Sequence, residues 1–221
     1  MTMICGIDEA GRGPLAGPVC AAAVVLPDDF PVEVLADSKK LKQRQREDAR
    51  CIIVDRAVSW GIGWASHDEI DAINILRASL LAMRRAFMYL AVPATGSGGT
   101  PWSQKLETEA PFGKPFSPGV FGAGPFPENL TAIADGLYTP DLPIPCAALV
   151  KADDKVHEVM AASILAKTAR DQLMVHYGTL YPQYGYEVHK GYPTARHREL
   201  VLAYGPSPIQ RKTFQKKKEK R

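Results

Sequence analysis

The chain lacks any long apolar segment. None of its hydrophobic runs reaches the roughly 20 residues that a membrane-spanning helix requires. Its first residues also lack the basic start and the long apolar stretch of a secretory signal peptide. The sequence therefore predicts a protein that does not insert into a membrane.

Cysteine is scarce as well. The 221 residues include four cysteines, and no two of them have the C-x-x-C spacing that is typical of zinc knuckles. Disulfide-rich frameworks belong to secreted proteins, and this sequence has no such pattern. We therefore expect reduced cysteines, no zinc knuckle and a cytoplasmic location.

A strong charge of either sign is missing from the body of the chain. The net charge is +3, but residues 211–221 alone contain seven basic residues and one acidic residue. When these are removed from the totals of 27 basic and 24 acidic residues, 20 basic and 23 acidic residues remain. The basic character therefore lies at the end of the chain, where residues 215–221 form a basic tail. Such tails are either solvated ends or non-specific nucleic-acid contacts.

The remaining composition is that of a globular domain. Hydrophobic residues make up 46% and charged residues 23%, and residues 1–214 are enough for one domain with a substantial core. Residues 91–128 differ, because seven prolines and seven glycines interrupt these 38 positions. We predict an irregular insertion, part of which packs on the domain through its phenylalanines. It could be a substrate lid or a neutral surface insertion.

The most informative stretch runs from residue 5 to residue 26. A short apolar segment ends in Asp8 and Glu9. A turn rich in glycine follows, and residues 19–26 form a second apolar segment. This pattern predicts two strands joined by a Gly-rich turn. A dinucleotide-binding loop is excluded, since that motif opens a helix. The turn can still offer backbone N–H groups to a phosphate, and Arg12 can bind a phosphate or a carboxylate.

Asp8 and Glu9 are adjacent carboxylates at the end of the first strand. Neighbouring strand residues point to opposite faces, so both reach one site only where the strand ends and twists. Carboxylates held close together repel each other unless a proton or a cation lies between them. Oxygen ligands of this kind suit Mg²⁺ or Mn²⁺. A solvated acidic pair without a metal is the alternative interpretation.

Hydrophobic periods predict the other elements. We expect strands over residues 58–66, 130–135 and 145–150, and helices over residues 41–57, 67–70, 73–90, 155–177 and 194–204. Ser38 is the expected N-cap of the first helix, and the two lysines after it would meet either a ligand anion or solvent, because the helix dipole disfavours cations there. Trp60, Ile62 and Trp64 should share one face of their strand.

Further candidate site residues follow these elements. Asp135 and Asp153 come at the ends of two predicted strands, where a rigid scaffold can hold a site. Residues 189–194 form a turn whose side chains can hold a phosphate and a sugar ring. Lys167 and Arg170 lie on the helix predicted over residues 155–177. Their spacing allows each side chain to point either toward the carboxylates or outward.

Six segments of the chain resemble one family. They are residues 8–19 (DEAGRGPLAGPV), 37–41 (DSKKL), 74–86 (NILRASLLAMRRA), 161–171 (AASILAKTARD), 182–194 (PQYGYEVHKGYPT) and 207–214 (SPIQRKTF). In order and spacing they resemble bacterial ribonuclease HII. The resemblance covers nearly the whole chain apart from the insertion and the last residues.

This resemblance implies an α/β fold: an RNase H-like, mixed five-stranded sheet flanked by helices, with a small C-terminal helical extension. It implies that Asp8, Glu9, Asp135 and Asp153 are the catalytic residues and the ligands of Mn²⁺ or Mg²⁺. The expected reaction is endonucleolytic hydrolysis of the RNA strand of RNA–DNA hybrids. Cutting 5′ of a single ribonucleotide in duplex DNA is also expected, with 3′-hydroxyl and 5′-phosphate products. The protein is expected to be a monomer.

The resemblance also implies a set of substrate contacts. The Gly-rich turn would recognise the 2′-hydroxyl, a tyrosine would pack on the sugar at the RNA–DNA junction, and four lysines would contact phosphates. These residues are Gly11, Arg12, Gly13, Lys39, Lys40, Lys167, Lys190 and Tyr192.

Three residues depart from the family pattern. Ala152 replaces a glycine before Asp153 and would strain the loop if that position required a positive φ. Leu137 and Gln210 stand where a polar residue and a histidine are common. Two other interpretations stay open. One is a related metal nuclease, such as a resolvase-like or integrase-like enzyme, and the other is a catalytically silent nucleic-acid-binding protein.

Overall fold

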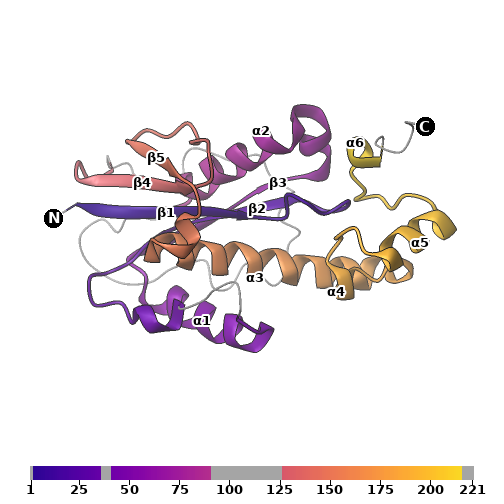
Figure 1. The fold of residues 1–221 in the computed structure, drawn as a ribbon, viewed down its shortest axis with the longest axis horizontal. Coiled ribbons are helices and arrows are strands. Elements are labelled where there is room, and N and C mark those ends of the chain that lie inside the picture. The colour runs from indigo at the N-terminus through magenta and orange to yellow at the C-terminus, as the bar shows by residue number, and fades with distance from the viewer. Residues whose placement is uncertain (1, 36–40, 91–125, 216–221) are drawn as a thin grey trace.

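The computed structural model describes residues 2–35, 41–90 and 126–215 (Figure 1). Its strands are β1 (Met3–Ala10), β2 (Val19–Val25), β3 (Ser59–Ala65), β4 (Leu130–Asp135) and β5 (Cys146–Leu149). Its α-helices are α1 (Gln43–Arg56), α2 (His67–Met88), α3 (His157–Leu180), α4 (Tyr186–His189), α5 (Ala195–Tyr204) and α6 (Lys212–Gln215). Short 3-10 helices cover Val32–Leu35 (η1), Ala152–Asp154 (η3) and Pro182–Tyr184 (η4).

The five strands form one mixed sheet in the order β3-β2-β1-β4-β5. β1 pairs antiparallel with β2, and β2 pairs antiparallel with β3, whereas β4 runs parallel to both β1 and β5. The pairing of β1 with β4 aligns Ile7 with Ala134, so the next residues along the two strands are Asp8 and Asp135. The predicted mixed five-stranded sheet is confirmed.

Helices cover both faces of the sheet. Figure 1 shows α2 on one face and α1 and α3 on the other. Alternate residues of β2 therefore enter two different cores: Val19 and Ala21 pack with α2, and Cys20 and Ala22 pack with α1 and α3. β2 is buried along its whole length, which explains why its sequence is apolar without alternation.

Helix α2 packs directly on the backbone of β3. Trp60, Ile62 and Trp64 share the opposite face of this strand, as predicted, and pack toward α1 and α3. The residues between them include Gly63, where a Cβ atom would lie only 2.1 Å from the carbonyl oxygen of Ala82 in α2. Glycine is needed at this position because any side chain would push the helix away from the sheet.

The predicted helices are present, with two changes. The segments predicted as two helices form α2, which is kinked at Asn74, where φ is 68°. The Asn74 side chain accepts the N–H of Arg77 at 3.1 Å and so caps the second part of α2. α1 begins at Gln43 with Lys42 as its N-cap. The prediction of Ser38 as the N-cap of this helix is therefore wrong, and Ser38 itself lies outside the described residues.

The end of the predicted insertion is among the described residues. Phe126 packs on Phe87 of α2 with ring centroids 4.7 Å apart, beside the core under that helix. The other phenylalanines of the insertion, its interpretation as a lid, and residues 216–221 of the basic tail lie outside the described residues. Among the described residues, no helix is both long enough and apolar enough to span a membrane.

The predicted small C-terminal helical extension is confirmed. η4, α4, α5 and α6 follow α3 and gather at one end of the molecule (Figure 1). A third core holds them against α3, and it includes Met174, Tyr177, Tyr186 and Ile209. Ala16 of the Gly-rich turn belongs to the same core. The extension therefore packs against the turn that joins β1 to β2.

Candidate active site

Asp8 and Glu9 lie inside β1, just before its last residue, Ala10. Asp8 is buried, with 6% of its surface exposed, and the side chain of Glu9 is 9% exposed. The N–H of Glu9 donates to Asp8 Oδ1 at 2.7 Å, and the side chain of Ser163 in α3 forms a hydrogen bond with Asp8. These contacts hold the Asp8 carboxylate in one orientation.

Asp135 and Asp153 lie near this strand end through separate contacts. Asp135 is the last residue of β4, and the parallel pairing places it beside Asp8. Its Oδ1 accepts the N–H of Ala152 at 2.7 Å. Asp153 is the next residue in η3 and is 8% exposed. A hydrogen bond therefore holds the backbone of η3 at the carboxylate of Asp135.

The condition under which Ala152 would strain its loop, a positive φ at that position, is not met. Among the described residues other than glycine, positive φ values occur at Asn74, Lys151 and Lys190. The left-handed position of this loop is thus Lys151, with φ of 57°, and Ala152 begins η3. An alanine fits there because its φ lies outside the region that favours glycine.

The electrostatics of the carboxylates favour a cation. Burial raises the pKa of Asp8 well above its ordinary value, and the charges of Glu9 and Asp135 raise it further. Burial also raises the pKa of Glu9, although Arg12 opposes this with Nη1 3.1 Å from Glu9 Oε1. Glu9 Oε2 is buried without a hydrogen-bond partner among the described residues. Acidic groups with too few donors bind a proton or a cation.

Within the described ranges, the side chains do not enclose an ion by themselves. In the described part of the chain, no three Asp, Glu, His or Cys side chains are grouped closely enough to hold a metal. Magnesium sites commonly combine one or two carboxylates with water and substrate phosphates. The charge and the oxygen donors therefore fit a hard divalent cation whose coordination is completed from outside the protein.

Two glycines of the Gly-rich turn have different surroundings: Gly11 is the inner glycine, packed on Arg170, and Gly13 is the outer glycine, with space around it. Gly11 has φ of 99°, and a Cβ on it would lie 2.0 Å from Arg170 Nε. A Cβ on Gly13 would meet no atom within 4 Å. Arg12, whose side chain is 50% exposed, forms its ion pair with Glu9. Gly11 therefore allows close packing underneath the turn, and Gly13 borders open space.

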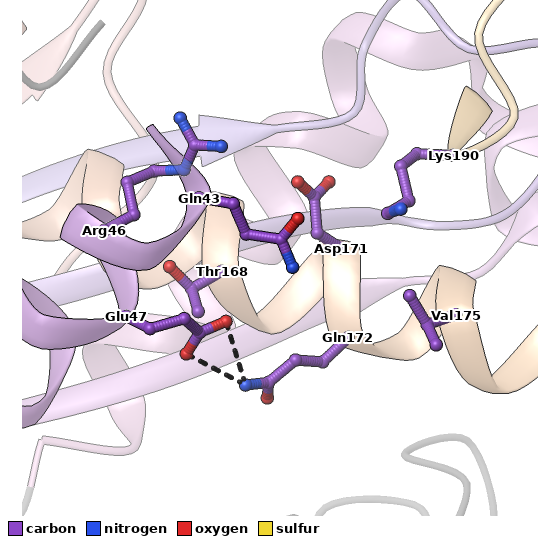
Figure 2. A pocket seen from close by; sticks show the side chains of 8 residues that line it. All are labelled: Gln43, Arg46, Glu47, Thr168, Asp171, Gln172, Val175 and Lys190. Carbon is purple, nitrogen blue, oxygen red and sulfur yellow. Dashed lines mark hydrogen bonds between the residues drawn. The ribbon is translucent and has the colours of Figure 1, made fainter. Parts of the chain in front are cut away.

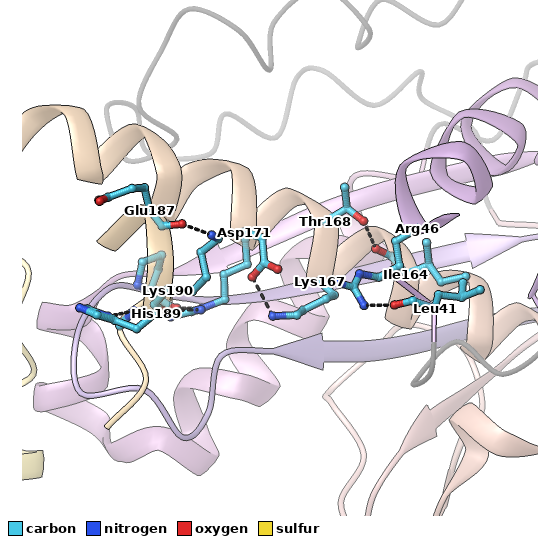
Figure 3. A network of polar contacts seen from close by, with 12 residues as sticks. Leu41, Arg46, Ile164, Lys167, Thr168, Asp171, Glu187, His189 and Lys190 are labelled. Atoms are coloured by element: carbon cyan, nitrogen blue, oxygen red, sulfur yellow. Dashed lines mark hydrogen bonds and ion pairs between the residues drawn. The ribbon is translucent and has the colours of Figure 1, made fainter. Parts of the chain in front are cut away.

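Three of the predicted substrate contacts gather beside α3. Tyr192 is 37% exposed, and Lys167 Nζ lies 5.4 Å from its ring centroid. Lys167 also forms an ion pair of 2.7 Å with Asp171, and Lys190 Nζ donates to the carbonyl oxygen of Glu187 (Figure 3). The structure thus brings Lys167, Lys190 and Tyr192 into one neighbourhood.

A pocket of about 240 Å³ lies between α1 and α3, next to this neighbourhood (Figure 2). It is lined by Gln43, Arg46, Glu47, Thr168, Asp171, Gln172, Val175 and Lys190. Glu47 and Gln172 are joined by a hydrogen bond of 3.3 Å. None of the four candidate carboxylates lines the pocket. Lys39 and Lys40, which precede α1 in the sequence, lie outside the described residues.

Sequence reasoning missed the positions of two arginines. Arg170 and Arg211 are completely buried, and both bind backbone carbonyls of the Gly-rich turn. Arg170 therefore points neither toward the carboxylates nor outward, which contradicts both alternatives considered for it. Arg211 belongs by sequence to a basic segment that indicates a solvated end. No local signal marks either residue, since burial of an arginine depends on which distant segment covers it.

Comparison with known proteins places the chain in a family. The family model described as Ribonuclease HII matches residues 5–95 and 134–218. The Ribonuclease HII of Treponema denticola is 50% identical over 215 residues, which covers 96% of this chain and 98% of that protein. The solved ribonuclease H2 from Pyrococcus horikoshii OT3 shares the fold, with a TM-score of 0.64, 23% identity, and coverage of 96% of this chain and 93% of that one. Bst-RNase HIII in complex with Mn²⁺ also shares it, with a TM-score of 0.64, 15% identity, and coverage of 92% and 63%. The chain therefore belongs to the ribonuclease HII family and is a ribonuclease H enzyme.

Proposed function

We propose that this enzyme hydrolyses the RNA strand of RNA–DNA hybrids and also cuts 5′ of a single ribonucleotide in duplex DNA, leaving a 3′-hydroxyl and a 5′-phosphate. The observation that carries the proposal is the accumulation of buried negative charge at the ends of β1 and β4. Asp8 and Glu9 both have raised pKa values because they are buried, and Glu9 Oε2 is buried without a hydrogen-bond partner among the described residues. Membership of the ribonuclease HII family supports the choice of substrate.

Asp8, Glu9, Asp135 and Asp153 are the proposed ligands of Mn²⁺ or Mg²⁺. When bound, such ions supply an activated water and stabilise the leaving oxygen of the phosphodiester. The chain's own contribution is orientation. Ser163 and the Glu9 N–H hold Asp8, and the Ala152 N–H holds Asp135. Arg12 holds one oxygen of Glu9 and leaves the other free to bind a ligand.

The proposed substrate contacts come from the Gly-rich turn, from Tyr192 and from four lysines. The open space at Gly13 can accept a ribose, and the N–H groups of the turn can meet its 2′-hydroxyl, the group that distinguishes RNA from DNA. Tyr192 would pack on the sugar at the junction, and Gly11 and Arg12 would complete the turn. The proposed phosphate contacts are Lys39, Lys40, Lys167 and Lys190.

The proposal also covers the organisation and setting of the protein. Residues 1–214 would form the catalytic domain, with residues 91–128 inserted in it and residues 215–221 as a basic tail. We propose a monomer that works in the cytoplasm without a membrane. The four cysteines are free in the described structure.

Cleavage assays test this function directly. Three duplexes of equal length would be offered: an RNA–DNA hybrid, DNA with one ribonucleotide, and DNA alone. With Mn²⁺ or Mg²⁺ we expect the first two to be cut and the third to remain intact, and a chelator should stop the cutting. Binding of the hybrid without any cleavage in either metal would instead identify a catalytically silent nucleic-acid-binding protein.

Replacing Tyr192 by alanine should weaken recognition of the junction more than cleavage of a long hybrid. Aromatic stacking contacts with nucleic acids contribute about 1–3 kcal/mol, so cutting at a single ribonucleotide should fall roughly 10- to 100-fold. Tyr204→Ala is the matched control, because Tyr204 is 60% exposed at the end of α5. An equal loss on both substrates would contradict the recognition role of Tyr192.

A further inference from the structure

Two buried arginines lie under the Gly-rich turn. Arg170 comes from α3, and Arg211 comes from the segment between α5 and α6. Both are 0% exposed, and within the described ranges neither forms an ion pair with a carboxylate. Buried charges are normally paired with an opposite charge. These two guanidinium groups donate hydrogen bonds to backbone carbonyls, which indicates that the arginines hold the backbone of the turn in its conformation.

Arg211 binds four carbonyls of the turn. Its Nη2 donates to Gly11 O at 2.6 Å and to Pro18 O at 3.1 Å. Its Nη1 donates to Arg12 O at 3.0 Å, and its Nε donates to Gly17 O at 2.8 Å. One side chain therefore joins the two ends of the turn, near β1 and near β2.

Arg170 connects the same turn to the segment that carries Tyr192. Its Nε donates to Pro18 O at 3.0 Å, and its Nη2 donates to Ala16 O at 3.3 Å. Its Nη1 donates to Lys190 O at 3.0 Å. Pro18 O accepts from both arginines, so the two guanidinium groups form one continuous support.

These bonds decide which way the peptide groups of the turn face. The described chain contains no cis peptide bond. In a trans peptide the C=O of one residue and the N–H of the next point in opposite directions. Because Arg211 draws the carbonyls of Gly11 and Arg12 inward, the N–H groups of Arg12 and Gly13 face away from it. Gly13 borders open space, so these donors are available to a ligand.

The segment around Arg211 is itself held in place. Arg211 N donates to Leu15 O at 2.9 Å, and Gly17 N donates to Ile209 O at 2.9 Å. The carboxylate of Asp71 in α2 accepts the N–H groups of Lys212 and Thr213 at 2.8 and 2.9 Å. The guanidinium of Arg211 is therefore fixed by contacts on both sides of it in the sequence.

We propose that Arg211 is a positioning residue for substrate selection. It holds the Gly-rich turn so that the N–H groups of Arg12 and Gly13 face the ribose, and the C-terminal segment thereby controls recognition of a single ribonucleotide. This inference rests on the proposed function. Burial and the charge of Arg170 lower the pKa of Arg211 to about 9, so the guanidinium stays protonated at neutral pH.

Arg211→Lys separates the charge from the shape of the side chain. Lysine keeps the positive charge but has one ammonium group, which cannot replace the planar fork that reaches four carbonyls. We expect kcat for DNA with one ribonucleotide to fall about 10- to 100-fold, the effect expected from a small misplacement of a substrate-binding group. Cleavage of a long hybrid should fall less, because each of its many ribonucleotides can bind at the turn and be cut there.

Arg211→Ala with added guanidinium separates positioning from general stability. The substitution leaves a cavity, and engineered cavities can bind small molecules of matching shape. We expect guanidinium at low millimolar concentration to restore single-ribonucleotide cutting, and urea at the same concentration to have no effect. Both assays are run well below the melting temperature of each variant, so that the folded protein is compared throughout.

Arg56→Lys and Arg56→Ala are the matched controls. Arg56 ends α1, pairs with the exposed Asp29 at 3.1 Å, and lies at the other end of the sheet from the turn. The positioning role is wrong if Arg211→Lys keeps the wild-type ratio between the two substrates. It is also wrong if guanidinium restores nothing in folded Arg211→Ala. Wild-type protein that cuts neither substrate would overturn the proposed function itself.

Discussion

Asp8→Asn is expected to lower turnover roughly a thousandfold, comparable to the loss of other electrostatic groups that act directly at a reacting centre. Asp8 is buried near the end of β1, beside Glu9 and Asp135, and burial together with these two charges raises its pKa well above the ordinary value. Asparagine keeps the shape and removes the charge. The measurement is single-turnover cleavage of the ribonucleotide-containing duplex at saturating Mn²⁺.

The same substitution should stabilise the metal-free protein. The folded-state pKa of Asp8 is raised, first by burial and then by Glu9 and Asp135. A carboxyl with a raised pKa favours folding at low pH, and this contribution is lost as pH rises from about 4 through the folded-state pKa. In a chelator, the melting temperature of the wild type should therefore fall with rising pH more steeply than that of Asp8→Asn. Added Mn²⁺ should raise the melting temperature of the wild type more than that of the variant.

Asp141→Asn is the control for both measurements. Asp141 forms an ion pair with Arg84 at 3.1 Å, and its side chain is 86% exposed, so the same chemical change there should alter neither turnover nor the pH profile. Normal turnover in Asp8→Asn would remove Asp8 from the catalytic set. A wild-type melting temperature that does not respond to pH or metal would contradict the repulsion argument.

Gly11→Ala is expected to destabilise the protein by about 2–4 kcal/mol, because alanine is strained at a positive φ and overpacks a buried site. The φ of Gly11 is 99°, and the new Cβ would lie 2.0 Å from Arg170 Nε. The side chain of Arg170 cannot retreat without losing its bonds to the carbonyls of Ala16, Pro18 and Lys190. For a chain of this size the melting temperature should fall by roughly 5–15 °C.

Gly13→Ala is the matched comparison two residues away. The added Cβ meets no atom within 4 Å, and Gly13 has no positive φ, so the melting temperature should stay close to that of the wild type. Cleavage should nevertheless fall if substrate fills that open space. Circular dichroism melts and cleavage assays on both variants distinguish the two effects. Normal stability in Gly11→Ala, or normal cleavage in Gly13→Ala, would contradict the inner and outer assignment of these glycines.

Local features of the sequence predicted most elements because short-range physics decides them. The apolar run of β2, the alternation of Trp60, Ile62 and Trp64 in β3, and the apolar stripe of α2 are each visible within a few residues. The error at Ser38 arose because several polar residues near position 40 can begin a helix, and the choice depends on contacts outside the segment. The concern about Ala152 arose because sequence alone does not tell which of two adjacent residues takes the positive φ, and the structure assigns it to Lys151.

The sequence by itself determined the family, the strand–turn–strand at Asp8 and the set of four candidate carboxylates, since these depend on local order and spacing. Only the tertiary structure decided that Asp135 lies beside Asp8, because this follows from the parallel register of β1 and β4. It alone also decided that Arg170 and Arg211 are buried under the Gly-rich turn. Their partners in the Gly-rich turn are carbonyls more than 150 residues away in the chain, as the separations of 152 positions between Arg170 and Pro18 and 200 positions between Arg211 and Gly11 illustrate. No local pattern encodes such contacts, because they exist only once the C-terminal segment has folded back over the first turn.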